Sequence, residues 1–96
     1  MLDRITSADF ANLAPQSLLL AIQGHECYPE ISDIREFSPH SARVTTPFTL
    51  TLIAPHDWRF PQGLYDLIHP TLGKLSLFMV PTGPCEQGMR YEIIFN

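Results

Sequence analysis

The side chains that could carry chemistry in this sequence form no complete metal-binding pattern. The nearest approach is His25-Glu26-Cys27, where the alternation of a strand would place His25 and Cys27 on one side. A structural zinc site needs four ligands, usually in closely spaced pairs, and no second pair follows. We therefore predict no metal site, and we expect a surface histidine beside a buried thiol.

Motifs of catalysis and of cofactor binding are also missing from the sequence. There is no Gly-x-Ser-x-Gly turn to present a nucleophilic serine, and the glycines stand singly rather than in a phosphate-binding loop. Asp57 and Asp66 flank the tryptophan segment, but no spacing rule brings their carboxylates together. We predict a protein that is not an enzyme and that binds no cofactor.

Candidate binding residues lie in two groups. The segment His56–Phe60 contains a tryptophan, an arginine and a phenylalanine, which are types suited to interface hot spots. It is either a partner-binding loop or a plug that fills one end of a barrel. A second site could be built from two tyrosines, a histidine and an arginine, although His69 before Pro70 also suits a structural role in a turn. The binding residues that we predict are Trp58, Arg59, Phe60, Tyr65, His69, Arg90 and Tyr91.

Composition limits the classes of protein to which the chain can belong. Its 96 residues form one domain, 1–96, and its 45% hydrophobic and 17% charged residues are typical of a folded chain. A net charge of −4 argues against nucleic acid as a partner. The longest apolar run, Leu18–Ile22, is far below the roughly 20 residues of a membrane span. We see no signal peptide, so we expect a cytoplasmic protein with Cys27 and Cys85 as free thiols.

The elements that would position these residues are short strands. A short helix is expected over Thr6–Leu13, capped by Thr6 or Ser7 and stopped before Pro15. Strands are expected over 17–23 with a continuation at 25–28, and over 31–37, 48–54, 64–69, 74–80 and 89–95. The irregular apolar spacing of 31–37 indicates a bulge, and the polar loop 38–43 follows it.

These elements predict an all-β fold, an antiparallel barrel or sandwich of about six strands with a short N-terminal helix. The charged stretch from Glu26 to Glu36 is expected to form a solvated edge strand. The strand over 74–80 is apolar on both faces, so we expect it in the centre of the sheet. The prolines and glycines fall mostly at the expected strand ends.

A family resemblance rests mainly on the last third of the chain. The patterns are Gln-Gly-x-Tyr at 62–65, His-Pro-x-Leu-Gly at 69–73, Leu-Phe-x-Val-Pro-x-Gly-Pro at 77–84 and Arg-Tyr-Glu at 90–92. The chain thereby resembles an uncharacterised family of bacterial domains of unknown function of about this length. The resemblance implies a stand-alone bacterial domain encoded near phage-tail-like collar proteins, with an accessory or assembly role and no catalytic residues.

These observations favour a non-enzymatic interaction or assembly-accessory module with a protein partner. Self-association through an edge strand is a further expectation. The alternative is a barrel that binds or hydrolyses a small ligand with Tyr65, His69 and Arg90. A deep pocket lined by those three residues would favour the alternative.

Overall fold

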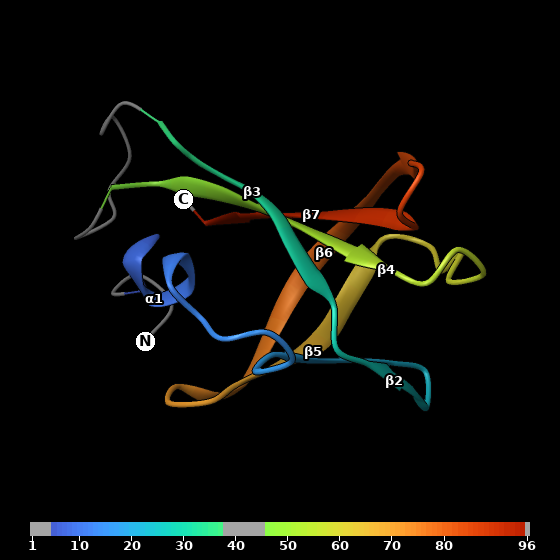
Figure 1. The fold of residues 1–96 in the computed structure, drawn as a ribbon, viewed down its shortest axis with the longest axis horizontal. Coiled ribbons are helices and arrows are strands. Elements are labelled where there is room, and N and C mark those ends of the chain that lie inside the picture. Colours follow the sequence, from blue (N-terminus) through green and yellow to red (C-terminus); the bar gives the residue numbers. More distant parts are fainter. Residues whose placement is uncertain (1–4, 38–45, 96) are drawn as a thin grey trace.

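The computed structural model describes residues 5–37 and 46–95 of the chain (Figure 1). In chain order the elements are α1 (Ala8–Ala11), β1 (Leu19–Ile22), β2 (His25–Cys27), β3 (Glu30–Glu36), β4 (Phe48–Ala54), β5 (Gly63–His69), β6 (Gly73–Pro84) and β7 (Met89–Phe95). The predicted loop at 38–43 lies outside the described residues. No helix in the described part of the chain is long and apolar enough to cross a membrane.

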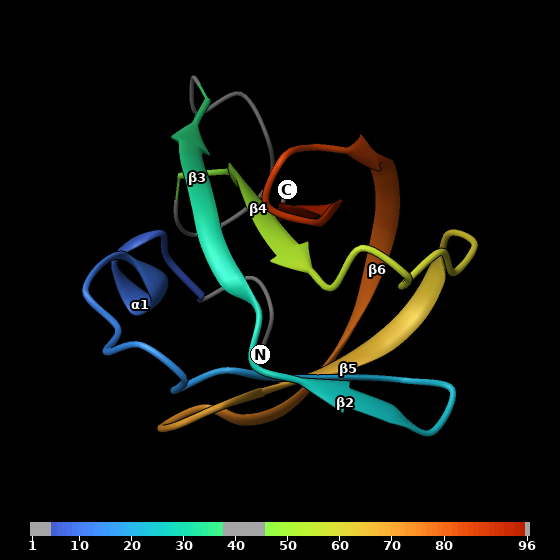
Figure 2. The same ribbon diagram turned by 45° about the vertical axis from the view of Figure 1, so that its right-hand side comes forward.

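The strands form one antiparallel sheet in the order β2-β1-β5-β6-β7-β4-β3, which curves into a half-barrel (Figure 2). The all-β prediction is confirmed, and so is the central position of β6. Six strands were expected and the described residues form seven, because β2 turns back after Gly24 and pairs with β1 as a hairpin. β2 and β3 are neighbours in sequence, joined by Tyr28 and Pro29, yet they lie at opposite edges of the sheet.

Strict alternation explains the buried face of the sheet. In β4 the side chains of Phe48, Leu50, Leu52 and Ala54 are buried as predicted. In β7 the inward residues follow the same period of two. Paired strands bring these rows together, and the rings of Phe48 and Phe95 stack with centroids 4.5 Å apart. The core therefore sits inside the curve of the sheet.

β6 is longer than predicted. The segment Pro81–Pro84 was expected to be the hairpin loop, but it continues the strand, and the turn lies at 85–88 instead. Proline cannot donate to a ladder, so a strand that contains it needs an irregularity. The pairing with β7 shifts register between Pro81 and Gly83, which supplies that irregularity. The prediction was wrong because proline was taken to end the strand.

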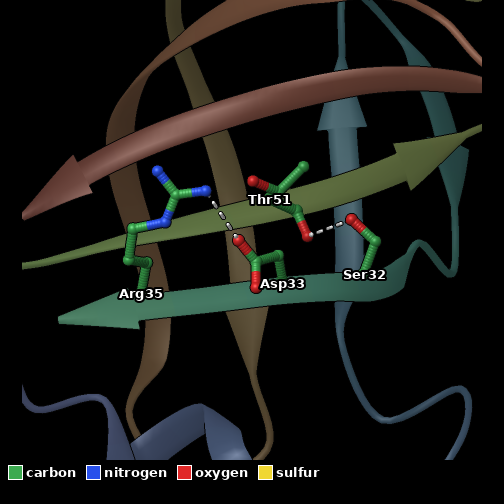
Figure 3. Close-up of polar contacts among 4 residues, drawn as sticks. All are labelled: Ser32, Asp33, Arg35 and Thr51. Atoms are coloured by element: carbon green, nitrogen blue, oxygen red, sulfur yellow. Dashed lines mark hydrogen bonds and ion pairs between the residues drawn. The ribbon is translucent and has the colours of Figure 1, made fainter.

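The predicted bulge in the third strand is confirmed. The register of β3 against β4 shifts between Ile31 and Asp33. Near this shift the Ser32 hydroxyl reaches across to the Thr51 carbonyl at 3.4 Å, and Arg35 lies 3.7 Å from Asp33 (Figure 3). The extra residue lets the isoleucines of β3 face the core despite their spacing of three.

α1 has one turn, which is shorter than the predicted helix over Thr6–Leu13. The Asp9 carboxylate accepts a hydrogen bond of 2.8 Å from the Thr6 backbone N–H, which ties the first turn to the residue before its N-cap. The Ser7 hydroxyl makes no cap and donates instead to Glu36 at 2.6 Å. This bond ties the helix to β3, and Figure 2 shows α1 beside that strand. Phe10 buries the other side of the turn against the core.

Candidate functional site

The aromatic segment after β4 folds into the end of the half-barrel. Trp58 is only 7% exposed, Phe60 is half-buried, and the two rings meet edge to face at 5.6 Å. The buried Tyr91 hydroxyl donates to the Trp58 carbonyl at 2.7 Å and accepts from the Phe60 N–H at 2.9 Å. Arg59 points outward and is exposed. Of the two interpretations of this segment, the structure matches the plug that fills one end of the barrel rather than a protruding aromatic loop.

His25 and Cys27 lie beside this plug. The His25 ring contacts Phe60 with centroids 5.6 Å apart and Trp58 at 6.2 Å. Burial raises the pKa of the Cys27 thiol to about 11, so the thiol stays protonated at neutral pH. No cluster of three metal-ligating side chains occurs among the described residues. The thiol behaves as a small apolar group at the edge of the core.

His69 is buried and connects α1 to the β5–β6 turn. Its Nδ1 faces the backbone N–H groups of Thr71 at 3.1 Å and Leu72 at 3.2 Å, so Nδ1 must be an acceptor. Its Nε2 therefore carries the proton and donates to the Asp9 carbonyl at 2.6 Å. The ring also meets Phe10 edge to face at 5.3 Å. Both ring nitrogens have backbone partners, so His69 has a structural role.

The Tyr/His/Arg set does not form one cluster, because only the hydroxyls of Tyr65 and Tyr91 come near each other, at the adjacent residues Phe60 and Pro61. Tyr65 donates to the Pro61 carbonyl at 2.5 Å, and Tyr91 lies two strands away, with β6 between them. Burial is the main cause that raises the pKa of Tyr91, and the negative charge that Tyr65 would carry adds to it. Arg90 is exposed, because it alternates with the buried Tyr91.

Among the seven predicted binding residues, the structure brings together Trp58, Phe60 and Tyr91, and they contact one another as part of the core. His69 joins α1 and the β5–β6 turn instead. The two arginines are at the surface. None of the seven residues lines the hollow formed by residues within 10–18 and 28–31.

That hollow is a groove of about 520 Å³ at the seam where the sheet fails to close. One wall is the segment that leads from α1 into β1, and the other is the start of β3. We call it the seam groove, and it is lined by Phe10, Ala11, Leu13, Ala14, Pro15, Gln16, Ser17, Leu18, Tyr28, Pro29, Glu30 and Ile31. The Ser17 hydroxyl donates to the Ala14 carbonyl at 2.6 Å, which fixes the first wall.

An open strand edge adjoins the seam groove. Within the described residues β3 pairs along one side only, with β4, so the other side of its seven residues has no strand beside it. The Phe37 N–H donates to Pro47 on the β4 side. Since backbone groups alternate along a strand, the N–H groups of Glu36 and Ile34 point away from β4. No strand of the described residues pairs with them, and α1 lies beside the Glu36 end (Figure 2), where the Ser7 hydroxyl bonds Glu36.

Sequence reasoning missed the seam groove but found its edge. The charged stretch of Glu26, Glu30, Asp33, Arg35 and Glu36 was predicted to be a solvated edge strand, and all five residues are exposed on β2 and β3, the two edges. The groove itself depends on the distance between segments that are far apart along the chain. The one local signal was the charged strand, which indicated a missing neighbour.

Comparison with known proteins agrees with the resemblance seen in the sequence. The family model for a domain of unknown function, DUF6916, matches residues 5–95. No curated protein and no solved structure matches the chain. Because the family model spans almost the whole sequence, the chain belongs to the DUF6916 family.

Proposed function

We propose that the protein is a non-enzymatic interaction module that binds an extended segment of a protein partner at β3. The observation that carries this proposal is the open edge of β3 beside the seam groove. Strand addition at a sheet edge gives affinity through backbone hydrogen bonds, and neighbouring pockets read the side chains of the added strand. An edge of seven residues is long enough for such pairing.

The state of the other reactive side chains supports a binding role. The hydroxyls of Tyr65 and Tyr91 and both nitrogens of His69 are engaged with backbone groups. The Cys27 thiol is held protonated by burial. A general base or a nucleophile needs a polar atom directed at a substrate, and these atoms are directed at the fold. An accessory role in a bacterial, phage-tail-like assembly is the setting that we propose for the module.

Site-specific photo-crosslinking in the native host tests this proposal. A photo-reactive phenylalanine analogue would replace Arg35, which is exposed on β3, and in a control protein Ser76, which is exposed on the outer face of β6. Arg35 makes only a surface ion pair, so its loss costs little. We expect a protein adduct at Arg35, and we expect one contiguous stretch of the partner to carry the crosslink.

Two results would overturn the proposal. One is the absence of an adduct at Arg35. The other is an adduct at Ser76 alone, which would move the contact to the outer face of β5–β7. That face carries the exposed apolar side chains of Leu64, Phe78 and Ile94, so it is the alternative binding surface. An adduct between two copies of the chain would show self-association in place of a separate partner.

A small apolar ligand in the seam groove is a second candidate, favoured by the volume of the groove. About 520 Å³ lies inside the range of roughly 300–1,000 Å³ that ligand sites occupy. Native mass spectrometry of protein purified from its host tests this candidate. A bound mass that disappears on denaturation would support it, and an unliganded mass would refute it.

A further inference from the structure

We propose that the segment recognised at β3 is a strand that alternates basic and apolar residues. This inference rests on the proposed function and names the chemistry of its partner. Basic side chains of the segment would lie opposite the carboxylates of β3, and an apolar side chain would enter the seam groove. The argument combines the charge of the edge, its alternation and the composition of the groove.

The edge strand β3 is acidic. β3 holds three carboxylates, those of Glu30, Asp33 and Glu36, against one guanidinium. This strand therefore carries half of the net charge of −4 of the whole chain. The guanidinium, on Arg35, is already 3.7 Å from Asp33 (Figure 3). A cationic partner would relieve the repulsion that remains.

The two faces of β3 differ in the side chains they offer. Ile31 and Ile34 are half-buried and pack against the core, whereas Glu30, Asp33 and Arg35 are exposed. A strand added to this edge must match both faces, because directly opposed side chains interact. Apolar residues would continue the isoleucine face, and basic residues would face the carboxylates. Alternation with a period of two satisfies both conditions.

The seam groove adds a place for a bulky apolar side chain. It begins at Ile31 and continues over Tyr28, which is 59% exposed, to Leu13 and Leu18 on the opposite wall. Most of the lining side chains are apolar. Glu30, the first residue of β3, is the one lining residue that is charged at neutral pH, and it is exposed. A groove of this composition would hold an apolar residue with a cation beside it.

The same charges argue against a second copy of the chain at this edge. Two β3 strands paired with each other would bring the three carboxylates of one copy, on Glu30, Asp33 and Glu36, against the same three of the other. Like charges directly opposite destabilise a strand pair, and charged edges are a known means to prevent edge-to-edge association. The expectation of self-association through an edge strand therefore gives way to a basic partner.

Fluorescence anisotropy with defined peptides tests the inference on the whole protein. The probe is a labelled short peptide of alternating Lys and Val, and the comparison peptides alternate Glu and Val or Thr and Val. We expect the lysine peptide to bind tightest and to lose affinity as salt rises, since about 1 M salt shortens the Debye length to about 3 Å. Binding should shift the amide NMR signals of β3 rather than those of β6.

Two variants with the same net charge provide the matched control. Glu30→Gln/Asp33→Asn removes two carboxylates at the edge, and Asp57→Asn/Glu86→Gln removes two exposed ones elsewhere, so both proteins have the same net charge. Exposed ion pairs are weak, so we expect the edge variant to bind the lysine peptide about 2- to 30-fold less tightly. The control variant should bind as the parent protein does.

The outcomes separate this inference from the proposed function. Equal binding of all three peptides at β3, or equal effects of the two variants, would refute the basic partner and leave strand addition intact. Failure of every peptide to bind refutes the alternating segment. Strand addition itself is then judged by the crosslink at Arg35. A lysine peptide that shifts β6 signals instead would also refute the inference.

Discussion

Replacement of Tyr91 by phenylalanine removes one buried hydroxyl and leaves the ring in place. That hydroxyl bonds two backbone groups of the aromatic plug, the Trp58 carbonyl at 2.7 Å and the Phe60 N–H at 2.9 Å. A buried polar group left without its partner costs about 1–3 kcal/mol. Without the hydroxyl, water can reach the N–H of the half-buried Phe60 more easily than the carbonyl of the buried Trp58, so the carbonyl is the group left without a partner. We therefore expect Tyr91→Phe to lower the free energy of unfolding by about 1–3 kcal/mol.

The assay uses the only tryptophan of the chain, which lies in the plug itself. Urea unfolding followed by Trp58 emission gives the free energy of unfolding, and thermal unfolding should shift by about 4–8 °C for each kcal/mol. Emission of the folded variant should move to longer wavelength as the plug loosens. Tyr65→Phe is the control, because that hydroxyl makes a single exposed bond to Pro61 and its loss should change stability by less than about 0.5 kcal/mol.

Alkaline pH gives a second measure of the same hydroxyl. Burial raises the pKa of Tyr91 above its ordinary value of 10.0, so the unfolded chain loses this proton first as pH rises. The folded state then binds more protons, and stability falls as pH rises above about 10. Tyr91→Phe should remove this part of the fall. Equal stabilities of the Tyr91 and Tyr65 variants, with unchanged emission, would refute the bridging role.

Three further predictions concern other positions. Gly88→Ala should lower the free energy of unfolding in urea by about 1–3 kcal/mol, because a Cβ there would collide with the Ala54 carbonyl. The control Gly63→Ala makes only ordinary contacts and should unfold like the parent protein. The rate of Cys27 alkylation, followed by peptide mass spectrometry, should rise with pH with a midpoint near pH 11, and a midpoint near pH 9 would contradict the burial of the thiol. The free energy of unfolding should fall between pH 9.0 and about 11, because the unfolded chain loses this proton first. His69→Ala should cost about 2–4 kcal/mol in thermal or urea unfolding, because three backbone groups lose their partner, and a cost below about 0.5 kcal/mol would contradict that role.

Strand positions were predictable because their signals are local. The alternation of Phe48–Ala54 and of Met89–Phe95 places both strands with the bounds that the structure shows. The spacing of three between Ile31 and Ile34 indicated the bulge that the register confirms. The predicted Ser7 cap is absent because its hydroxyl donates to Glu36, a residue far along the chain. Sequence spacing cannot show a competing partner of that kind.

The candidate site was less predictable for the same reason. Residue types suggested that Tyr65, His69 and Arg90 could gather, but type does not say which face a side chain takes or which strands are neighbours. His69 is buried, where it accepts a hydrogen bond from the turn and donates one to α1. Arg90 lies on the outer face of the sheet and is exposed. The seam groove is formed by segments whose closeness depends on the strand order. No local pattern encodes that order.

The short link of Tyr28 and Pro29 has a consequence for the dynamics of the sheet. It joins the two edge strands, β2 and β3, which share no ladder and which, within the described residues, each pair with one strand only. Backbone hydrogen bonds at such margins open at lower free energy than those of the centre. We expect amide hydrogen exchange to be fastest there and slowest in β6 and β7. A strand bound at β3 would slow that exchange and raise the melting temperature with its concentration, so the partner would complete the β-sheet as well as bind to it.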